Sequence, residues 1–98
     1  MTPVAYHEAA EQELLDEIGY LELRAAGLGR RFFGEIEAAA KLISRFPESA
    51  AEISPGIRKY PLHKFPYSLI YTIEKDRLLV LAVAHHSRRP KYWVGRVG

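Results

Sequence analysis

The fold is decided by the stretch Arg77-Leu-Leu-Val-Leu-Ala-Val-Ala-His-His-Ser-Arg-Arg-Pro-Lys-Tyr-Trp93. Its first half, Leu78 to Ala84, is a continuous aliphatic run, and its second half is dense in cations and aromatic residues. A run of this length between turn signals is typical of a strand buried on both faces, although periodicity alone does not separate it from a buried helix. Pro90 ends either element. We predict a central strand that delivers a basic segment to one edge of a sheet.

The residues before this stretch predict its partner strands. From Tyr67 to Ile73 the side chains alternate between two faces. One face carries Tyr67, Leu69, Tyr71 and Ile73. The polar residues 74–77 then predict a turn that closes a hairpin onto the aliphatic strand. Ile57 to Tyr60 predicts a further strand, which Pro61 confines to an edge or a bulge.

Two amphipathic helices are predicted upstream of these strands. In residues 7–26 and again in residues 29–45, apolar residues recur every three or four positions and form one stripe. Gly27 suits the left-handed residue after the first helix, and Pro47 stops the second. Gly19 weakens the first helix, and we expect it to allow close approach of the partner helix. The short connection makes an antiparallel helical hairpin.

This order of elements predicts the fold class. Residues 3–6 are interpreted as a short edge strand and residues 48–56 as a connector. Helices followed by consecutive antiparallel strands define an α+β fold, with the helical hairpin packed on one face of the sheet. We predict a sheet of three to four strands in a single domain spanning residues 1–98.

Charge is divided unevenly along the chain. Residues 1–52 carry five Lys or Arg against ten Asp or Glu, a net charge of −5, whereas residues 53–98 carry nine against two, a net charge of +7. Such asymmetry favours a basic face aimed at a polyanion or an acidic protein. A solvated surface whose charges cancel between the two halves is the alternative.

Several classes of function are excluded by composition and motifs. The chain contains no cysteine, which excludes disulfides and thiolate metal sites and fits a reducing cytoplasm. No apolar run approaches the length of a membrane span. His85 and His86 are adjacent and would point to opposite faces of a strand, so no metal site is expected. No glycine-rich loop matches a nucleotide fingerprint, so no cofactor is expected.

The basic segment suggests RNA cleavage as one chemistry. Cleavage of a phosphodiester through its own 2′-hydroxyl needs a base, an acid and cations for the developing charge. These residue types occur in one short segment: His85 or His86, Arg88, Arg89, Lys91 and Tyr92. Arg58 and Lys59 can join them from another strand. Alternatively, Tyr92 and Trp93 form a C-terminal plug on the sheet and the arginines are solvated or pair with an acidic partner.

Three motifs together resemble the RelE/ParE toxin superfamily of type II toxin–antitoxin systems, the plasmid-stabilisation toxins. They are Ile57-Arg58-Lys59-Tyr60, the block from Phe65-Pro66-Tyr67 to Tyr71, and the block from Ala82 to Trp93, together with Pro47 after the second helix. The resemblance covers nearly the whole chain. It implies a small cytoplasmic toxin that a cognate antitoxin neutralises, in a toxin–antitoxin hetero-oligomer.

The superfamily divides by mechanism. RelE-type toxins cut mRNA in the ribosome with basic residues and a tyrosine near the C-terminus, whereas ParE-type toxins lack most of that set and are associated with poisoning DNA gyrase. On the RelE pattern, Ser68 and His86 stand where arginines are expected, and Pro61 stands where a second lysine is expected. Lys59 and Tyr92 match the pattern. Three expected cations are therefore missing, which weakens stabilisation of a phosphorane transition state.

The resemblance thus implies a ParE-like protein that inhibits DNA gyrase by binding it. Its target-binding or partner-binding surface would include Arg58, Arg88, Arg89, Lys91 and Trp93. The alternative is a ribosome-dependent mRNA endonuclease, in which histidine substitutes as acid or base. Its catalytic residues would be His86, Arg88, Tyr92 and Lys59. A third possibility is a chain that keeps the fold and the antitoxin but has little toxicity.

Overall fold

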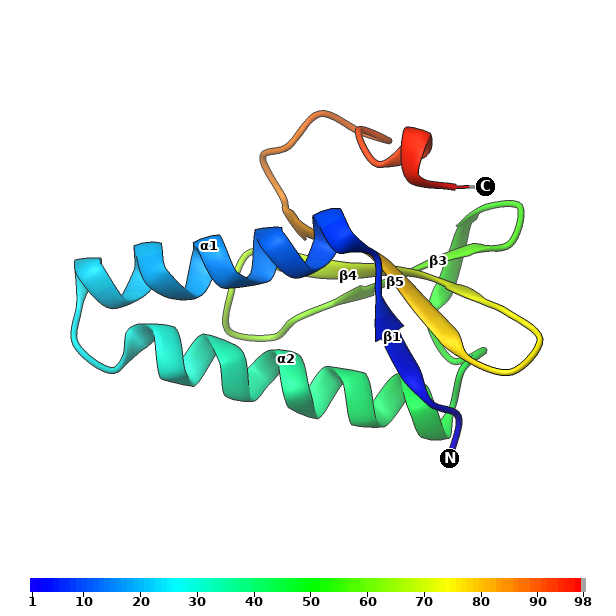
Figure 1. Cartoon of the computed structure of the whole chain (residues 1–98), viewed down its shortest axis with the longest axis horizontal. Coiled ribbons are helices and arrows are strands. Elements are labelled where there is room, and N and C mark those ends of the chain that lie inside the picture. Colours follow the sequence, from blue (N-terminus) through cyan, green and yellow to red (C-terminus); the bar gives the residue numbers. More distant parts are fainter. Residues whose placement is uncertain (98) are drawn as a thin grey trace.

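The computed structural model describes residues 1–97. Its elements run in the order β1 (Val4–Tyr6), α1 (Glu8–Arg24), α2 (Leu28–Arg45), β2 (Ala51–Ser54), β3 (Ile57–Pro61), β4 (Tyr67–Ile73), β5 (Leu78–His85) and the short 3-10 helix η1 (Val94–Arg96). The two helices lie antiparallel beside the sheet, and the C-terminal segment folds back toward the start of α1 (Figure 1). The α+β prediction is confirmed.

The sheet has five strands in the order β1-β5-β4-β3-β2. β1 pairs in parallel with β5, and the other neighbours are antiparallel. The antiparallel part of the sheet, β2 to β5, has four strands and agrees with the predicted three to four. The interpretation of residues 48–56 as a connector was wrong because this segment contains β2. This strand is mostly exposed and lies at the sheet edge, so it carries no alternation of apolar and polar residues. β5 is an interior strand as predicted, although β4 occupies the middle of the sheet.

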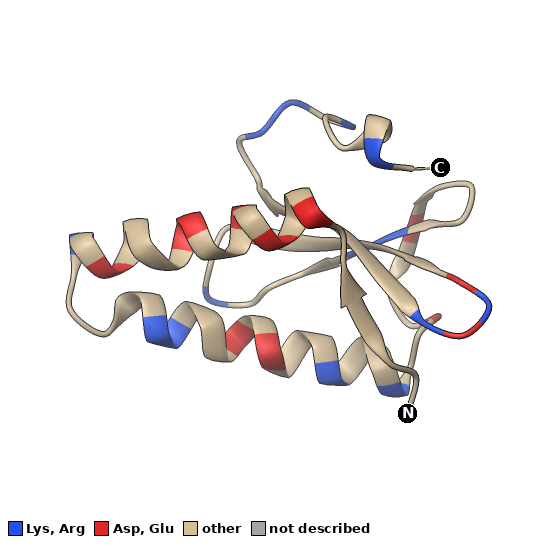
Figure 2. Cartoon of the chain, in the orientation of Figure 1, with Lys and Arg blue, Asp and Glu red and all other residues tan. Residues whose placement is uncertain are grey.

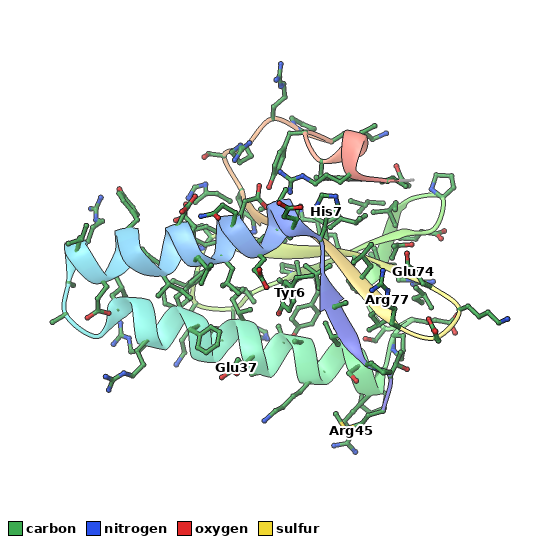
Figure 3. All side chains as sticks on the ribbon, viewed as in Figure 1. Tyr6, His7, Glu37, Arg45, Glu74 and Arg77 are labelled. Atoms are coloured by element: carbon green, nitrogen blue, oxygen red, sulfur yellow. The ribbon has the colours of Figure 1, made fainter. Side chains whose placement is uncertain are left out.

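The predicted turn between β4 and β5 is confirmed. The turn carries both signs of charge (Figure 2). Glu74 N donates to the carbonyl of Arg77 at 2.8 Å, and Arg77 Nε donates to Glu74 Oε1 at 2.6 Å (Figure 3). Both side chains are substantially exposed, so this ion pair fixes turn geometry more than it adds stability.

Local interactions explain where the helices begin and end. His7 Nδ1 accepts a hydrogen bond of 3.0 Å from Ala9 N and caps α1. The connection to α2 turns at Gly27, whose φ of 85° lies in the left-handed region. Glu22 then accepts from Gly27 N at 2.7 Å and from Gly29 N at 3.0 Å, so its carboxylate caps the first turn of α2. These hydrogen bonds lower the pKa of Glu22.

The close approach of the two helices occurs at Gly29, not at Gly19 as expected. A Cβ added at Gly29 would lie 2.4 Å from the carbonyl oxygen of Ile18, whereas a Cβ at Gly19 would meet nothing within 4 Å. Gly29 is therefore the residue whose missing side chain lets α2 start against α1. Its sequence position, directly after the turn, concealed this role.

A bulge in β5 explains why its sequence is aliphatic without alternation. Ile70 pairs with Ala82 and Tyr71 pairs with Val80, which leaves Leu81 as an extra residue. Val80 and Val83 pack in the core under the helices, whereas Leu81 and Ala82 both pack on the opposite face. The strand therefore serves two hydrophobic clusters, and the basic segment after it emerges on the face without helices.

Candidate functional site

The sheet face opposite the helices carries a pocket of about 310 Å³. β3, β4, the end of β5 and the C-terminal segment form its walls, and Ile53 of β2 adds to the rim. All four residues considered for catalysis line it: Lys59, His86, Arg88 and Tyr92. Arg89, Lys91 and Trp93 line it too, whereas Arg58 does not. We call this cavity the basic pocket.

The two adjacent histidines point to opposite faces, as their spacing predicts. His86 Nε2 lies 3.0 Å from Ser68 Oγ inside the basic pocket, and Ser68 is only 1% exposed. The His85 ring stands edge-on against Tyr67, with 4.8 Å between ring centroids. Tyr67 belongs to the core under the helices and donates its hydroxyl to Glu17. Of the two histidines, His86 is therefore the one whose side chain contacts Ser68.

Tyr92 lies between two guanidinium groups. The carbon of the Arg88 guanidinium is 3.9 Å from the ring centroid and that of Arg96 is 5.1 Å away. The hydroxyl is buried and has no hydrogen-bond partner among the described residues. Burial raises the pKa of Tyr92 to about 12, and the nearby Glu13 carboxylate adds to the increase. The tyrosine thus stays neutral, with its hydroxyl held inside the protein.

Glu13 and Arg96 organise this region, and sequence reasoning missed both. Arg96 Nη1 and Nη2 donate to the two carboxylate oxygens of Glu13 at 2.9 and 3.0 Å. Glu13 also accepts from Val83 N at 3.0 Å, and Arg96 donates to the Leu81 carbonyl at 2.9 Å. Arg88 stands 4.0 Å from the same carboxylate. No local pattern signals the pair, because 83 positions separate its members.

Two residues assigned to target binding contact the protein itself. Arg58 donates to the carbonyls of Glu48 and Ala50 at 3.1 and 2.7 Å, and so fixes the segment that leads into β2. Trp93 is 4% exposed and packs on the cluster that includes Ile70. The plug interpretation therefore describes Trp93 in this structure.

The remaining cations of the basic pocket are free of carboxylates. Lys59, Arg89 and Lys91 are exposed, and no ion pair within 4.0 Å involves them among residues 1–97. Lys91 adopts a φ of 60° in the turn before Trp93, a conformation that non-glycine residues rarely take. The described residues also contain no cluster of three side chains suited to a metal ion. The site offers positive charge and two histidines, of which His86 pairs with Ser68.

Comparison with solved structures identifies the fold. A solved chain of the chromosomal ParDE TA system from P. aeruginosa has the same fold, with a TM-score of 0.71 at 18% sequence identity over 87% of this chain and 96% of that chain. No curated protein matches the sequence.

The fold is thus one used by toxin–antitoxin proteins. Residues 4–90 match the family of ParE toxins of type II toxin–antitoxin systems, parDE. The chain belongs to this ParE toxin family, and it is a type II toxin. No helix within residues 1–97 is both long and apolar enough to cross a membrane.

Proposed function

We propose that this ParE-family toxin acts in the cytoplasm by binding and inhibiting DNA gyrase, and that a cognate antitoxin neutralises it. Family membership supports the toxin assignment. The chemistry of the basic pocket supports inhibition by binding. Three of the cations expected in a RelE-type nuclease are replaced by Pro61, Ser68 and His86.

The observation that carries the proposal is that the hydroxyl groups of Ser68 and Tyr92 are both buried. Ser68 is buried and its hydroxyl is already paired with His86, so this position offers no cation to a phosphate. The Tyr92 hydroxyl is buried beside Glu13 with a raised pKa, and the Arg88 guanidinium lies over its ring. A nuclease needs such groups directed at the scissile phosphate.

The antitoxin proposal rests on relatedness and charge. The solved relative comes from a ParDE toxin–antitoxin system. Residues 53–98 of this chain carry a net charge of +7, which favours an acidic partner. A small acidic or amphipathic protein encoded next to this gene should co-purify with the chain. A neighbouring region without such a protein would contradict this part of the proposal.

One observation favours the nuclease as the second candidate. Lys59 of β3 lines the same pocket as His86, Arg88 and Tyr92, which come from the segment after β5. Opening of the C-terminal segment would release the Tyr92 hydroxyl, with His86 as base or acid. Gyrase inhibition remains our first proposal because the pocket has too few free cations to stabilise the charge of a phosphorane transition state.

Induction of the chain in bacteria without its antitoxin distinguishes the two candidates. We expect altered plasmid supercoiling, a DNA-damage response and intact mRNA. His86→Ala should leave these effects in place, whereas Lys59→Glu with Lys91→Glu should reduce them. Codon-phased mRNA ends with normal plasmid topology, abolished by His86→Ala, would establish the nuclease instead. Unaffected growth with both readouts normal would refute both mechanisms.

A further inference from the structure

We infer that the basic pocket receives an acidic protein segment that inserts one apolar side chain between the free cations. The inference rests on the proposed function, in which the toxin acts by binding a protein, and it specifies the chemistry of that contact. Three observations support it independently of one another: the charges at the rim, the apolar floor, and the burial of Trp93 with the covering of the Tyr92 ring by Arg88.

Charge selects an anionic partner. The pocket lining includes Lys59, Arg88, Arg89 and Lys91 but no Asp or Glu. Arg88 is partly neutralised by Glu13 at 4.0 Å, which leaves three uncompensated cations on two sides of the opening. Lys59 comes from β3 and the other two come from the turn after β5, so carboxylates spaced along an extended chain can reach both sides.

The floor selects an apolar side chain. Ile70 and Trp93 are almost fully buried beneath the opening, and Ala84 is partly buried beside them. Ile53 projects from β2 at the rim and is 40% exposed. Many protein contacts bury one apolar side chain of the partner in a pocket and surround it with polar interactions. An exposed Ile53 at the rim of this pocket suits such a contact.

The position of the two aromatic rings argues against nucleic acid as the occupant. Proteins that bind single-stranded nucleic acid present exposed rings on which bases stack. Trp93 is 4% exposed, and Arg88 covers the ring of Tyr92 at 3.9 Å. The pocket therefore offers positive charge without a stacking platform. Carboxylates of a protein segment meet all the features of the site, whereas bases meet only the charge.

Direct binding by fluorescence anisotropy tests the inference. The probes are a labelled acidic peptide with a central leucine, the same peptide with serine in place of leucine, and an oligouridylate of equal charge. The variant Lys59→Glu with Lys91→Glu removes two free cations. Lys41→Glu with Lys75→Glu is the matched control, because both are exposed lysines outside the basic pocket and the net charge changes equally.

We expect the leucine peptide to bind the wild-type chain more tightly than either other probe. The pocket variant should lose about tenfold in affinity, and the control variant should stay within about twofold. Ile53→Ser should weaken binding of the leucine peptide and leave the serine peptide unchanged. Equal losses in both lysine variants, or tighter binding of the oligouridylate, would overturn the inference.

The same proteins separate this inference from the proposed function. A wild-type chain that binds the peptide through the pocket but leaves gyrase supercoiling unaffected would refute the gyrase target and retain the peptide site. A chain that inhibits gyrase equally well with and without Lys59 and Lys91 would refute the pocket as the contact and retain the target.

Discussion

Glu13 of α1 and Arg96 of η1 form a bidentate ion pair, with nitrogen–oxygen distances of 2.9 and 3.0 Å. The pair lies along the edge of β5 that β1 leaves open, since β1 ends where Tyr6 pairs with Val80. Beyond that point, Val83 N donates to Glu13 and the Leu81 carbonyl accepts from Arg96. The two side chains thus take up the backbone hydrogen bonds of β5 that a neighbouring strand would otherwise make. They also attach the C-terminal segment to α1.

The first prediction concerns the stability that this pair provides. Glu13→Gln and Arg96→Gln should each lower the free energy of unfolding by about 2 kcal/mol, because each leaves a partly buried charge without its partner. The double variant should lose less than the sum of the two, with a coupling of about 1 kcal/mol or more. Urea denaturation of the four proteins measures these values. Strictly additive losses would contradict the pairing.

The second prediction uses Trp93, which is the only tryptophan in the chain. Its burial at 4% exposure predicts blue-shifted emission and weak quenching by acrylamide in the folded protein. Arg96→Gln should raise the quenching before any global unfolding, because the segment that carries Trp93 loses its attachment. Glu74→Gln, which breaks only the exposed turn ion pair, is the control and should leave quenching unchanged. Strong quenching of the wild-type protein would show that Trp93 is exposed to solvent and would contradict its burial.

The third prediction concerns the helical hairpin. Gly29→Ala should lower the free energy of unfolding by about 2 kcal/mol or more, because its Cβ would lie 2.4 Å from the Ile18 carbonyl oxygen. Gly19→Ala should raise it by up to about 1 kcal/mol, since an exposed helical glycine gains from alanine. Thermal denaturation of the two variants measures both the expected loss and the expected gain of stability. A neutral Gly29→Ala would contradict the close packing of α1 and α2.

The fourth prediction concerns Tyr92 at alkaline pH. Its pKa is raised to about 12 from 10.0 in the fold, so the neutral hydroxyl favours the folded state. This contribution is complete below pH 10 and is lost as the pH rises toward 12. Tyr92→Phe should therefore show a shallower loss of stability than wild type over that interval. At neutral pH the same change should cost less than about 1 kcal/mol, because the hydroxyl has no described partner.

Chemical denaturation at a series of pH values compares the two proteins. The burial of Tyr67 also raises its pKa, and its hydroxyl donates to Glu17, so Tyr67→Phe provides the contrast. That variant loses a real hydrogen bond and should be less stable than wild type at neutral pH. A Tyr92→Phe protein that follows the wild-type pH profile would contradict the burial of this hydroxyl.

Local sequence patterns predicted the elements that carry a strong period or a strong turn signal. The helical stripes and the β4 alternation persist over many residues, so each could be assigned without tertiary information. β2 is short, exposed and at an edge, and β3 is its only neighbour within residues 1–97. Such a strand is defined by its partner, so its own residues carry little signal. The bulge at Leu81 likewise leaves no mark inside an aliphatic run.

Sequence reasoning named most of the polar residues that line the basic pocket, but not the ion pair that holds the C-terminal segment in place. The dense segment after β5 revealed His86, Arg88 and Tyr92, because chemistry-bearing residues there are close in sequence. Glu13 and Arg96 come from opposite ends of the chain, and only the fold brings them together. Arg58 had the charge of a binding residue, yet its hydrogen bonds go to backbone carbonyls, which composition does not reveal.

The supercoiling of relaxed plasmid by purified gyrase measures the proposed inhibition itself. Addition of the wild-type chain should block supercoiling or trap cleaved plasmid, and the variant Lys59→Glu with Lys91→Glu should need a concentration about tenfold higher for the same effect. The control Lys41→Glu with Lys75→Glu should act like wild type. Normal supercoiling in the presence of folded wild-type chain would contradict the claim that this toxin inhibits gyrase by binding.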